Sequence, residues 1–304
     1  MRVITTLCMT LLISVLYSQE YIDPLKLYFA TSPNTGYDGA DGTTSINEYG
    51  GEIMVPRPFG DGHALILGVH TELTTLMPEP NTEVLNLYTI GPRLGVLWQH
   101  NEKWSGQYVL LPQIASDLKG FGWNDVQMGA IGIVSYKKSE RTQYRFGAFY
   151  NSALYGPAVF AVLGFYHKSE NKKWTWDFRL PIDADINYKI NDKFSTGIHF
   201  DAMLRSYYLN DPLFNSGNEY IVKSTQEPFL YMNYSPAKNF VFMLKLGHSA
   251  FRHYRMFNTD DKVDFVFTGA TFNDNRTQLN HDQKDNFILQ LRFHYRFFLD
   301  GQKR

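Results

Sequence analysis

The stretch WTWDFRLPIDADINYKI, residues 174–190, decides the fold class of this chain. Its even positions are all apolar, and its odd positions are polar or charged apart from Pro181. A period of two describes a β-strand with one apolar and one polar face. The run is far longer than the roughly five or six residues usual for a strand of a soluble domain. It therefore predicts a strand of a membrane-spanning β-barrel, with Ile182 and Ala184 facing lipid near the midplane.

Aromatic residues lie toward both ends of this apolar face. If the run is one straight strand, at roughly 3.3 Å per residue and a tilt of about 40°, Trp176 and Tyr188 lie around 30 Å apart along the membrane normal. The lipid-facing band of such barrels is about 25 Å tall and has aromatic residues at both edges. We therefore expect these two rings at opposite membrane interfaces.

The first residues have the features of a secretory signal peptide, which we expect over residues 1–18. A positive charge precedes an apolar run, residues 3–16, that is too short to cross a membrane as a helix, and Ser18 is a small residue at the expected cleavage site. Cys8 is the only cysteine, so the chain after cleavage cannot form a disulfide. Residues 19–304 contain no linker or low-complexity block, and we expect them to form one outer-membrane β-barrel domain.

Composition agrees with a barrel in the cell outer membrane. Aromatic residues make up 16% of the chain, while the mean hydropathy is only −0.30, as expected when half of each strand faces water. The net charge of −1 gives no sign of a nucleic-acid partner. The expected partners are outer-membrane lipid and, during biogenesis, the barrel-assembly machinery, because the last predicted strand ends in aromatic residues at 297–298. No substrate or ligand is identified.

The same alternation recurs along the chain and predicts an all-β fold, an antiparallel transmembrane β-barrel of about 12–14 strands. The candidate strands are residues 25–32, 46–56, 63–76, 84–100, 104–117, 126–137, 143–155, 158–168, 174–190, 194–209, 220–234, 240–256, 263–269 and 286–298.

The turns conflict with a single strand at residues 174–190. Short polar turns flank both of its ends, at 168–173 and 190–192, although short turns of such barrels belong at one end. Pro181 offers an alternative, because proline removes a hydrogen-bond donor from the ladder and the run would then fold into a short hairpin. The sequence leaves both interpretations open.

The polar faces of the later strands carry charges of both signs, and we expect them to point into the lumen. This predicted lumen cluster comprises Asp177, Arg179, Asp183, Asp185, His199, Asp201, Arg205, Arg292, His294 and Arg296. Opposite charges on neighbouring strands stabilise each other, so we expect Arg179 and Arg205 to pair with the aspartates. A barrel of about 12 strands is wider than one that side chains fill and narrower than an open porin, so the paired side chains predict a narrow pore or structural barrel with little ion selectivity.

His199 and Asp201 also allow a catalytic interpretation, since a His–Asp pair can activate water or a serine. The alternative function is then an outer-membrane enzyme that hydrolyses lipid or peptide. The charge ladder explains the same residues, and we assign no catalytic residue. The chain has no zinc-ligand spacing and no phosphate-binding glycine loop, so we expect no cofactor and no metal. A soluble exported β-sandwich that binds a ligand is a further alternative, because its strands alternate too.

Residues 150–261 resemble an uncharacterised family of bacterial outer-membrane β-barrel proteins, a domain of unknown function. The resemblance is carried by GPAVFAVLGFYHKSENKKWTWDFRLPIDADINYKINDKFSTGIHFD at 156–201 and by SPAKNFVFMLKLGHSAFRHYRMFNTDDK at 235–262. It includes the pattern of Leu-Pro at 180–181, an alternating strand and an Asp-Lys turn at 192–193. The resemblance implies an exported barrel of a Gram-negative bacterium and implies no activity or functional residue.

Overall fold

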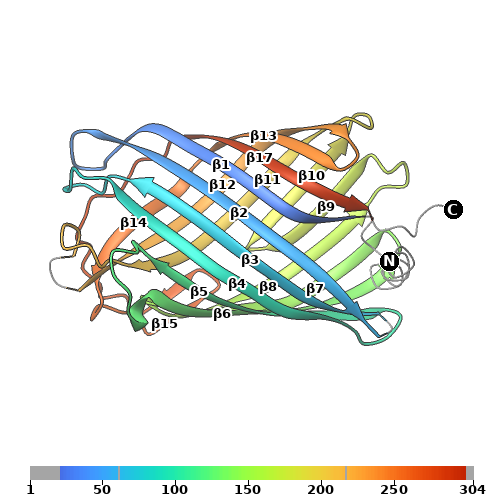
Figure 1. Cartoon of the computed structure of the whole chain (residues 1–304), viewed down its shortest axis with the longest axis horizontal. Helices are drawn as coiled ribbons and strands as arrows, with labels where there is room; N and C mark the ends of the chain where they lie inside the picture. Colours follow the sequence, from blue (N-terminus) through green and yellow to red (C-terminus); the bar gives the residue numbers. More distant parts are fainter. Residues whose placement is uncertain (1–20, 61, 216–217, 299–304) are drawn as a thin grey trace, which may run out of the picture.

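The computed structural model describes residues 21–60, 62–215 and 218–298, so the expected signal peptide at residues 1–18 lies outside the described residues. Fourteen antiparallel strands form a closed barrel (Figure 1), as the alternation predicts. They are β1 (Tyr21–Gly36), β2 (Thr43–Phe59), β3 (His63–Leu76), β4 (Leu85–Gln99), β5 (Trp104–Ser116), β6 (Val126–Ser139), β7 (Thr142–Ala153), β8 (Gly156–Lys168), β9 (Trp174–Leu180), β10 (Asp183–Lys189), β11 (Phe194–Tyr208), β12 (Glu219–Ala237), β13 (Phe240–His248), which β14 (Ala250–Asn258) continues, and β17 (Phe287–Phe298). The pairing of β1 with β17 closes the ring, so the alternative of a β-sandwich fold is wrong.

The two ends of the barrel differ. The first described residue of β1 and the last of β17 lie at one end, at the right of Figure 1, together with short turns such as 100–103 and 140–141. We call this the turn end. The opposite end carries the longer connections, including 209–218 and 259–286, and we call it the loop end. Within the described ranges no helix is long and apolar enough to cross a membrane.

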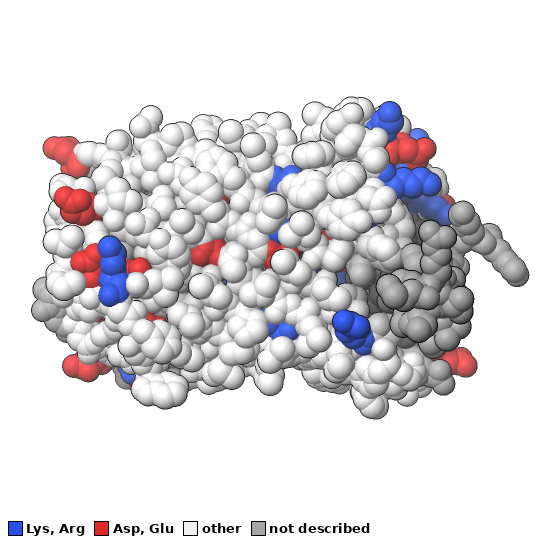
Figure 2. Space-filling view, in the orientation of Figure 1, with Lys and Arg blue, Asp and Glu red and all other residues white. Residues whose placement is uncertain are grey.

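The outward-facing rows of the strands form an apolar band. On β4 this row includes Trp98, Leu94 and Ile90, each more than 40% exposed. From Trp98 to Tyr88 the row rises about 25 Å, at roughly 3.3 Å per residue and a tilt of about 40°, which equals the height of a lipid-facing band. Figure 2 shows charged side chains gathered at the two ends of the molecule and a largely uncharged surface between them. The middle of the surface is uncharged because, along each strand, apolar side chains point outward and polar side chains alternate with them on the inner face.

An aromatic belt marks the turn-end edge of the band. Rings of neighbouring strands stand against each other there, with centroid distances of 4.9 Å for Trp104 and Tyr136 and 5.0 Å for Phe194 and Tyr234. Amphipathic rings at this height are typical of a membrane interface.

The run at residues 174–190 is two strands, so the interpretation as a single strand is wrong and the hairpin interpretation is confirmed. β9 and β10 pair in antiparallel register, and Ile182 N–H donates to the Arg179 carbonyl in the turn between them, at 2.8 Å. Trp176 and Tyr188 therefore do not lie at opposite interfaces. The ring of Tyr188 instead contacts that of Trp174, at 4.7 Å in the aromatic belt. Ile182 lines the internal cavity at the turn, where no regular strand holds it toward lipid.

Two other predicted strands also differ from the structure. Residues 263–269 do not enter the ring of fourteen strands but contribute to a small hairpin of β15 (Phe265–Phe267) and β16 (Ala270–Phe272), in which β15 runs parallel to β8. Residues 240–256 are interrupted at Ser249, because β13 pairs with β17 whereas β14 does not. The ring still contains fourteen strands, as the upper end of the predicted range has it. The predicted strand at 174–190 becomes two strands, and the predicted strand at 263–269 lies outside the ring.

Toward the loop end, β11, β12 and β14 leave the wall and cross the interior. Tyr208 of β11 forms a bridge with Ser116 of β5, which lies across the barrel. Gln127 of β6 donates to the carbonyl of Ser206, at 2.8 Å. We call the crossing segments the septum, namely residues 204–208, 219–225 and 252–258.

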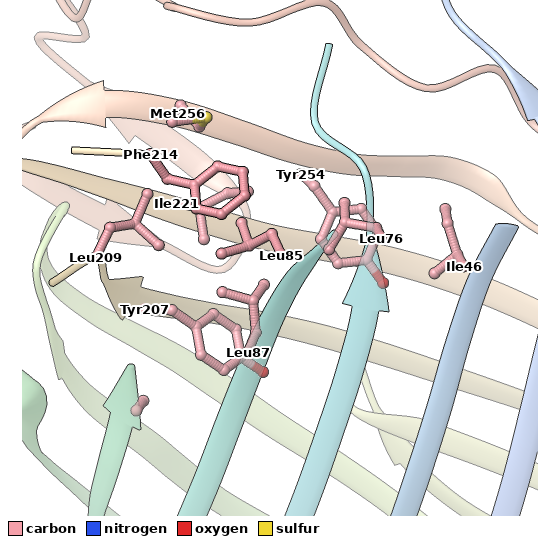
Figure 3. Close-up of a cluster of buried hydrophobic side chains, with 11 residues drawn as sticks. Ile46, Leu76, Leu85, Leu87, Tyr207, Leu209, Phe214, Ile221, Tyr254 and Met256 are labelled. Carbon is pink, nitrogen blue, oxygen red and sulfur yellow. The ribbon is translucent and has the colours of Figure 1, made fainter. Parts of the chain in front are cut away.

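Both faces of the septum are buried. Every residue of β12 from 219 to 223 is buried, although side chains alternate between the faces of a strand. One face packs against β2–β5 in a cluster of Ile46, Leu76, Leu85, Leu87, Ala115, Tyr207, Leu209, Phe214, Ile221, Tyr254 and Met256. Figure 3 shows these side chains meeting between the two sides of the barrel. The other face packs against β8 and β15 in a cluster of Tyr155, Ala158, Tyr220, Val222, Phe257, Val263 and Val266.

Candidate functional site

The barrel encloses a cavity of about 2100 Å³, which we call the vestibule and which reaches the turn end at Glu102, Lys103 and Glu140. The structure places all residues of the predicted lumen cluster along its wall. They are Asp177, Arg179, Asp183, Asp185, His199, Asp201, Arg205, Arg292, His294 and Arg296. The alternation brings them there, because residues two apart on a strand share a face.

Asp201 is the centre of the charged groups in the vestibule. Its carboxylate lies 3.2 Å from Lys245 Nζ, 3.4 Å from Arg292 Nη2 and 2.9 Å from His199 Nε2. The Lys245 side chain is fully buried, and its ammonium also lies 4.2 Å from the centroid of the Phe229 ring. Three strands, β11, β13 and β17, thus join their inward rows at one carboxylate.

His199 is held between two carboxylates. Asp185 lies 3.2 Å from Nδ1, and Asp201 lies 2.9 Å from Nε2, although the latter direction does not suit a hydrogen bond. Tyr231 donates to the other oxygen of Asp185 at 3.1 Å. Both ring nitrogens of His199 face carboxylates, so the imidazole is positioned to pair with Asp185 and Asp201. A general base needs one nitrogen directed at the proton that it removes, so this geometry gives no support to a hydrolase.

Other members of the predicted cluster also pair with opposite charges. Asp23, on β1, accepts a hydrogen bond from Arg296 Nε at 2.8 Å, and its carboxylate lies 3.3 Å from His294 Nδ1. Arg179 donates to Asp183 at 2.7 Å across the β9–β10 turn. Asp177 pairs with Arg145 of β7. The vestibule wall therefore contains acids and bases in contact, not a ring of one sign.

Arg205 does not pair with an aspartate, contrary to the expectation. Its guanidinium lies 3.3 Å from Glu72 on β3, across the interior. The reason is that the septum carries β11 away from the aspartate rows of β9 and β10. Glu72 also accepts hydrogen bonds from Lys223 at 3.0 Å and Tyr28 at 2.7 Å.

A buried layer of six charges thus links opposite sides of the barrel. Lys223 Nζ lies 2.9 Å from Glu48 as well as 3.0 Å from Glu72. Arg252 pairs with Glu227 at 2.7 Å. Three acids, Glu48, Glu72 and Glu227, meet three bases, Arg205, Lys223 and Arg252, so the layer is neutral. Removing one partner of a buried pair leaves an uncompensated charge, so the loss of any one of these side chains should be costly.

The predicted lumen cluster omits six buried charged residues of the interior, namely Glu48, Glu72, Lys223, Glu227, Lys245 and Arg252. Their signal is present, because Glu48 and Glu52 share one row of β2 and Lys223 and Glu227 share one row of β12. A charge in the polar row of a predicted strand is sufficient to nominate it. In the described part of the chain, no group of three His, Cys, Asp or Glu residues is arranged to hold a metal ion.

Solved barrels of similar shape include an outer membrane channel of Pseudomonas putida F1, with a TM-score of 0.46 and 9% identity over 92% of this chain and 98% of that one. A FadL homologue of Pseudomonas aeruginosa has a TM-score of 0.43 and 11% identity over 89% of each chain. The toluene transporter TodX of Pseudomonas putida has a TM-score of 0.34 and 9% identity over 89% of this chain and 88% of that one. No curated protein matches the chain.

The sequence pattern of one protein family matches residues 82–296, which is more than half of the chain. The family is described as a domain of unknown function, DUF6268. The match agrees with the resemblance to an uncharacterised barrel family that the strand patterns indicate. This β-barrel protein therefore belongs to the DUF6268 family.

Proposed function

We propose that this protein is an outer-membrane barrel of a Gram-negative bacterium with a water-filled vestibule at the turn end and an axial path obstructed by the septum. It is exported by the signal peptide at residues 1–18, contacts outer-membrane lipid and is inserted by the barrel-assembly machinery. The location is supported by the apolar band and by the aromatic belt at its turn-end edge.

The observation that carries the proposal is the burial of both faces of β12 at residues 219–223. A solute that moved along the barrel axis would have to separate the packed side chains of the septum from β2–β5. Lys223, fully buried between Glu48 and Glu72, holds the same two layers together by charge. In this arrangement, segments of the barrel strands themselves obstruct the axis.

The charges of the vestibule favour little ion selectivity. Asp201 is surrounded by Lys245, Arg292 and His199, and Asp23 by Arg296 and His294. Selective ion channels use rings of charges of one sign. Here each sign is accompanied by the other, so neither cations nor anions are concentrated along the wall.

Reconstitution of the purified protein into planar lipid bilayers tests the proposal. We expect no large, steady conductance, and any small currents should show little preference between potassium and chloride. A porin of known conductance, inserted under the same conditions, controls for insertion. A large and steady conductance, or a strong ion preference, would contradict the obstructed axis. Recovery of the protein in the soluble periplasmic fraction without detergent would contradict the membrane location.

A further inference from the structure

On one arc, β3–β8, the inner wall of the vestibule departs from the polar lining that alternation predicts. A row of apolar residues crosses these six strands, and each member lies directly opposite the next on the neighbouring strand. The row consists of Ile66, Gly95, Val109, Ile131, Phe149 and Phe160, and we call it the apolar stripe. Its five side chains line the vestibule. Lipid does not reach this face, so insertion into the membrane does not account for the stripe.

Further apolar side chains widen the stripe. Leu97 stands on its turn-end side and Leu111 on its loop-end side. Both are half-buried and line the cavity, as do Ile131 and Phe149 within the stripe. These four side chains present apolar surface to the interior of the vestibule. A ligand that covers this surface releases water from it, which favours binding.

The stripe climbs from the open end of the vestibule to the septum. Ile66 lies three residues from the turn-end start of β3, whereas Phe160 lies eight residues from the turn-end limit of β8. At roughly 3.3 Å per residue and a tilt of about 40°, these positions are about 8 and 20 Å above the turn end. At the upper end, the rings of Phe149 and Phe160 stack with centroids 6.1 Å apart, and Phe160 packs against the buried cluster of β8 and β15.

Arg93 of β4 stands beside the stripe. It is two residues from Gly95 on the same face of the strand. Its other neighbour in that row is Gly91, and its partner on β3 is Gly68. No side chain at these three positions covers the guanidinium, and the Arg93 side chain is 30% exposed. The guanidinium is therefore accessible to an anion that lies along the stripe.

Arg93 shares a single carboxylate with Lys26. Arg93 Nη2 lies 3.1 Å from Glu52 Oε2, and Lys26 Nζ lies 3.4 Å from Glu52 Oε1. Among the described residues, no second acid lies within ion-pair distance of either base. One acid between two bases leaves one positive charge here, although the vestibule as a whole carries both signs. The planar fork of arginine N–H donors matches a carboxylate.

We infer that the vestibule binds an organic anion with an elongated apolar body, namely a medium-chain carboxylate. Its carboxylate lies at Arg93, and its chain follows the stripe over Leu111 and Ile131 toward Phe149. Neighbouring strands are about 4.8 Å apart, so the path from β4 to β7 is about 14 Å long and fits an extended chain of roughly eight to ten carbons. Apolar walls with a few placed polar groups are typical of small-molecule sites. The inference rests on the proposed function in one respect, since the septum makes the vestibule a pocket that is entered from the turn end.

Equilibrium dialysis with radiolabelled octanoate tests the inference. The purified protein in phosphatidylcholine nanodiscs is dialysed against octanoate, and empty nanodiscs give the amount that partitions into lipid. We expect saturable binding above this blank. Unlabelled octanoate should displace the label, whereas acetate, which has the charge without the chain, should not. Octanamide, which has the chain without the charge, should bind more weakly than octanoate.

Arg93→Gln removes the proposed anion partner, and Arg57→Gln is the matched control. Arg57 is exposed on the opposite face of β2 from Pro56, which lines the cavity. We expect Arg93→Gln to weaken octanoate binding about tenfold or more, without weakening octanamide binding, because a hydrogen bond to a charged group is lost. Arg57→Gln should change neither. Ile131→Asn should weaken both ligands, because both lose apolar contact. If Arg93→Gln does not give the heat-modifiable folded form on a gel, Lys26→Gln takes its place, with a smaller loss expected.

The results separate this inference from the proposed function. Absence of saturable octanoate binding, or equal octanoate affinities in Arg93→Gln and Arg57→Gln, would overturn the site. Displacement by acetate as effective as that by octanoate would overturn it too, because the chain would then not be recognised. Saturable binding together with a large, steady conductance would overturn the obstructed axis and leave the site intact. Absence of both binding and conductance would overturn the site alone.

Discussion

The turn-end and loop-end halves of β12 have similar sequence patterns and different surroundings. Between Glu227 and Met232 burial alternates, and Leu230 is 65% exposed on the lipid-facing surface. Between Glu219 and Lys223 burial is continuous. One half is a single wall between lipid and a vestibule, whereas the other is the middle layer of three. The comparison teaches that alternation defines two faces of a strand and leaves open what covers each face.

The largest difference between the halves should be seen when a cation is removed. Lys223→Ala leaves Glu48 and Glu72 without their shared ammonium in the septum, and we expect it to lower the free energy of unfolding by about 3–5 kcal/mol. Lys26→Ala removes a vestibule cation that is 40% exposed and lies 3.4 Å from Glu52, and should cost less than about 1 kcal/mol. Urea titrations in lipid vesicles, followed by tryptophan fluorescence, measure both. Equal costs would show that the septum is no more tightly packed than the vestibule wall.

Truncation of an apolar side chain should follow the same order. Ile221→Ala removes a fully buried side chain from the septum, and we expect a loss of about 2–5 kcal/mol because the surrounding core cannot collapse completely. Leu230→Ala, on the same strand, should cost less, because lipid chains fill the space at its exposed site. The same titrations compare the two variants. A larger loss for Leu230→Ala would contradict the assignment of the two environments.

Arginine substitutions sharpen the comparison between lipid and cavity. Leu230→Arg places a charge on the lipid-facing surface and should cost about 2–4 kcal/mol. Ile182→Arg should cost less, because Ile182 lines the vestibule, where the guanidinium finds water. This expectation replaces the lipid-facing position that the single-strand interpretation gives Ile182. A cost for Ile182→Arg as large as that for Leu230→Arg in vesicle titrations would restore the lipid-facing position.

The smallest effect should come from a neutralised vestibule acid. Asp185→Asn keeps an acceptor for Tyr231, and we expect the free energy of unfolding to change by less than about 1 kcal/mol. Glu72→Gln makes the same change in the septum and should cost more, because Lys223 and Arg205 lose a buried partner. Equal tolerance in a urea titration would argue against the difference between the two sites.

The wall and the vestibule row could be predicted from the sequence because both follow from local alternation. The hairpin within residues 174–190 was also indicated, by the turns at both ends and by Pro181. The septum could not be predicted, because Tyr220 and Val222 occupy the outward row of an ordinary amphipathic strand. That row is covered by β8 and β15, which are far away in the sequence. The partner of Arg205 was missed for the same reason, since Glu72 is on β3.

The interruption at Ser249 has a consequence for the order of events during assembly. Ser249 N–H donates to the Asn286 carbonyl at 2.9 Å, and Asn286 N–H donates to Ser249 Oγ at 2.8 Å. At this branch point β13 stays beside β17 and β14 departs into the interior. Glu48 on β2 and Glu72 on β3 belong to the first part of the chain. Their cationic partners, Lys223 on β12 and Arg252 on β14, belong to the last part. Neutralisation of Glu48 and Glu72 therefore requires strands from both halves of the chain, and a barrel that lacks β12 and β14 would leave these two carboxylates without Lys223 and Arg252.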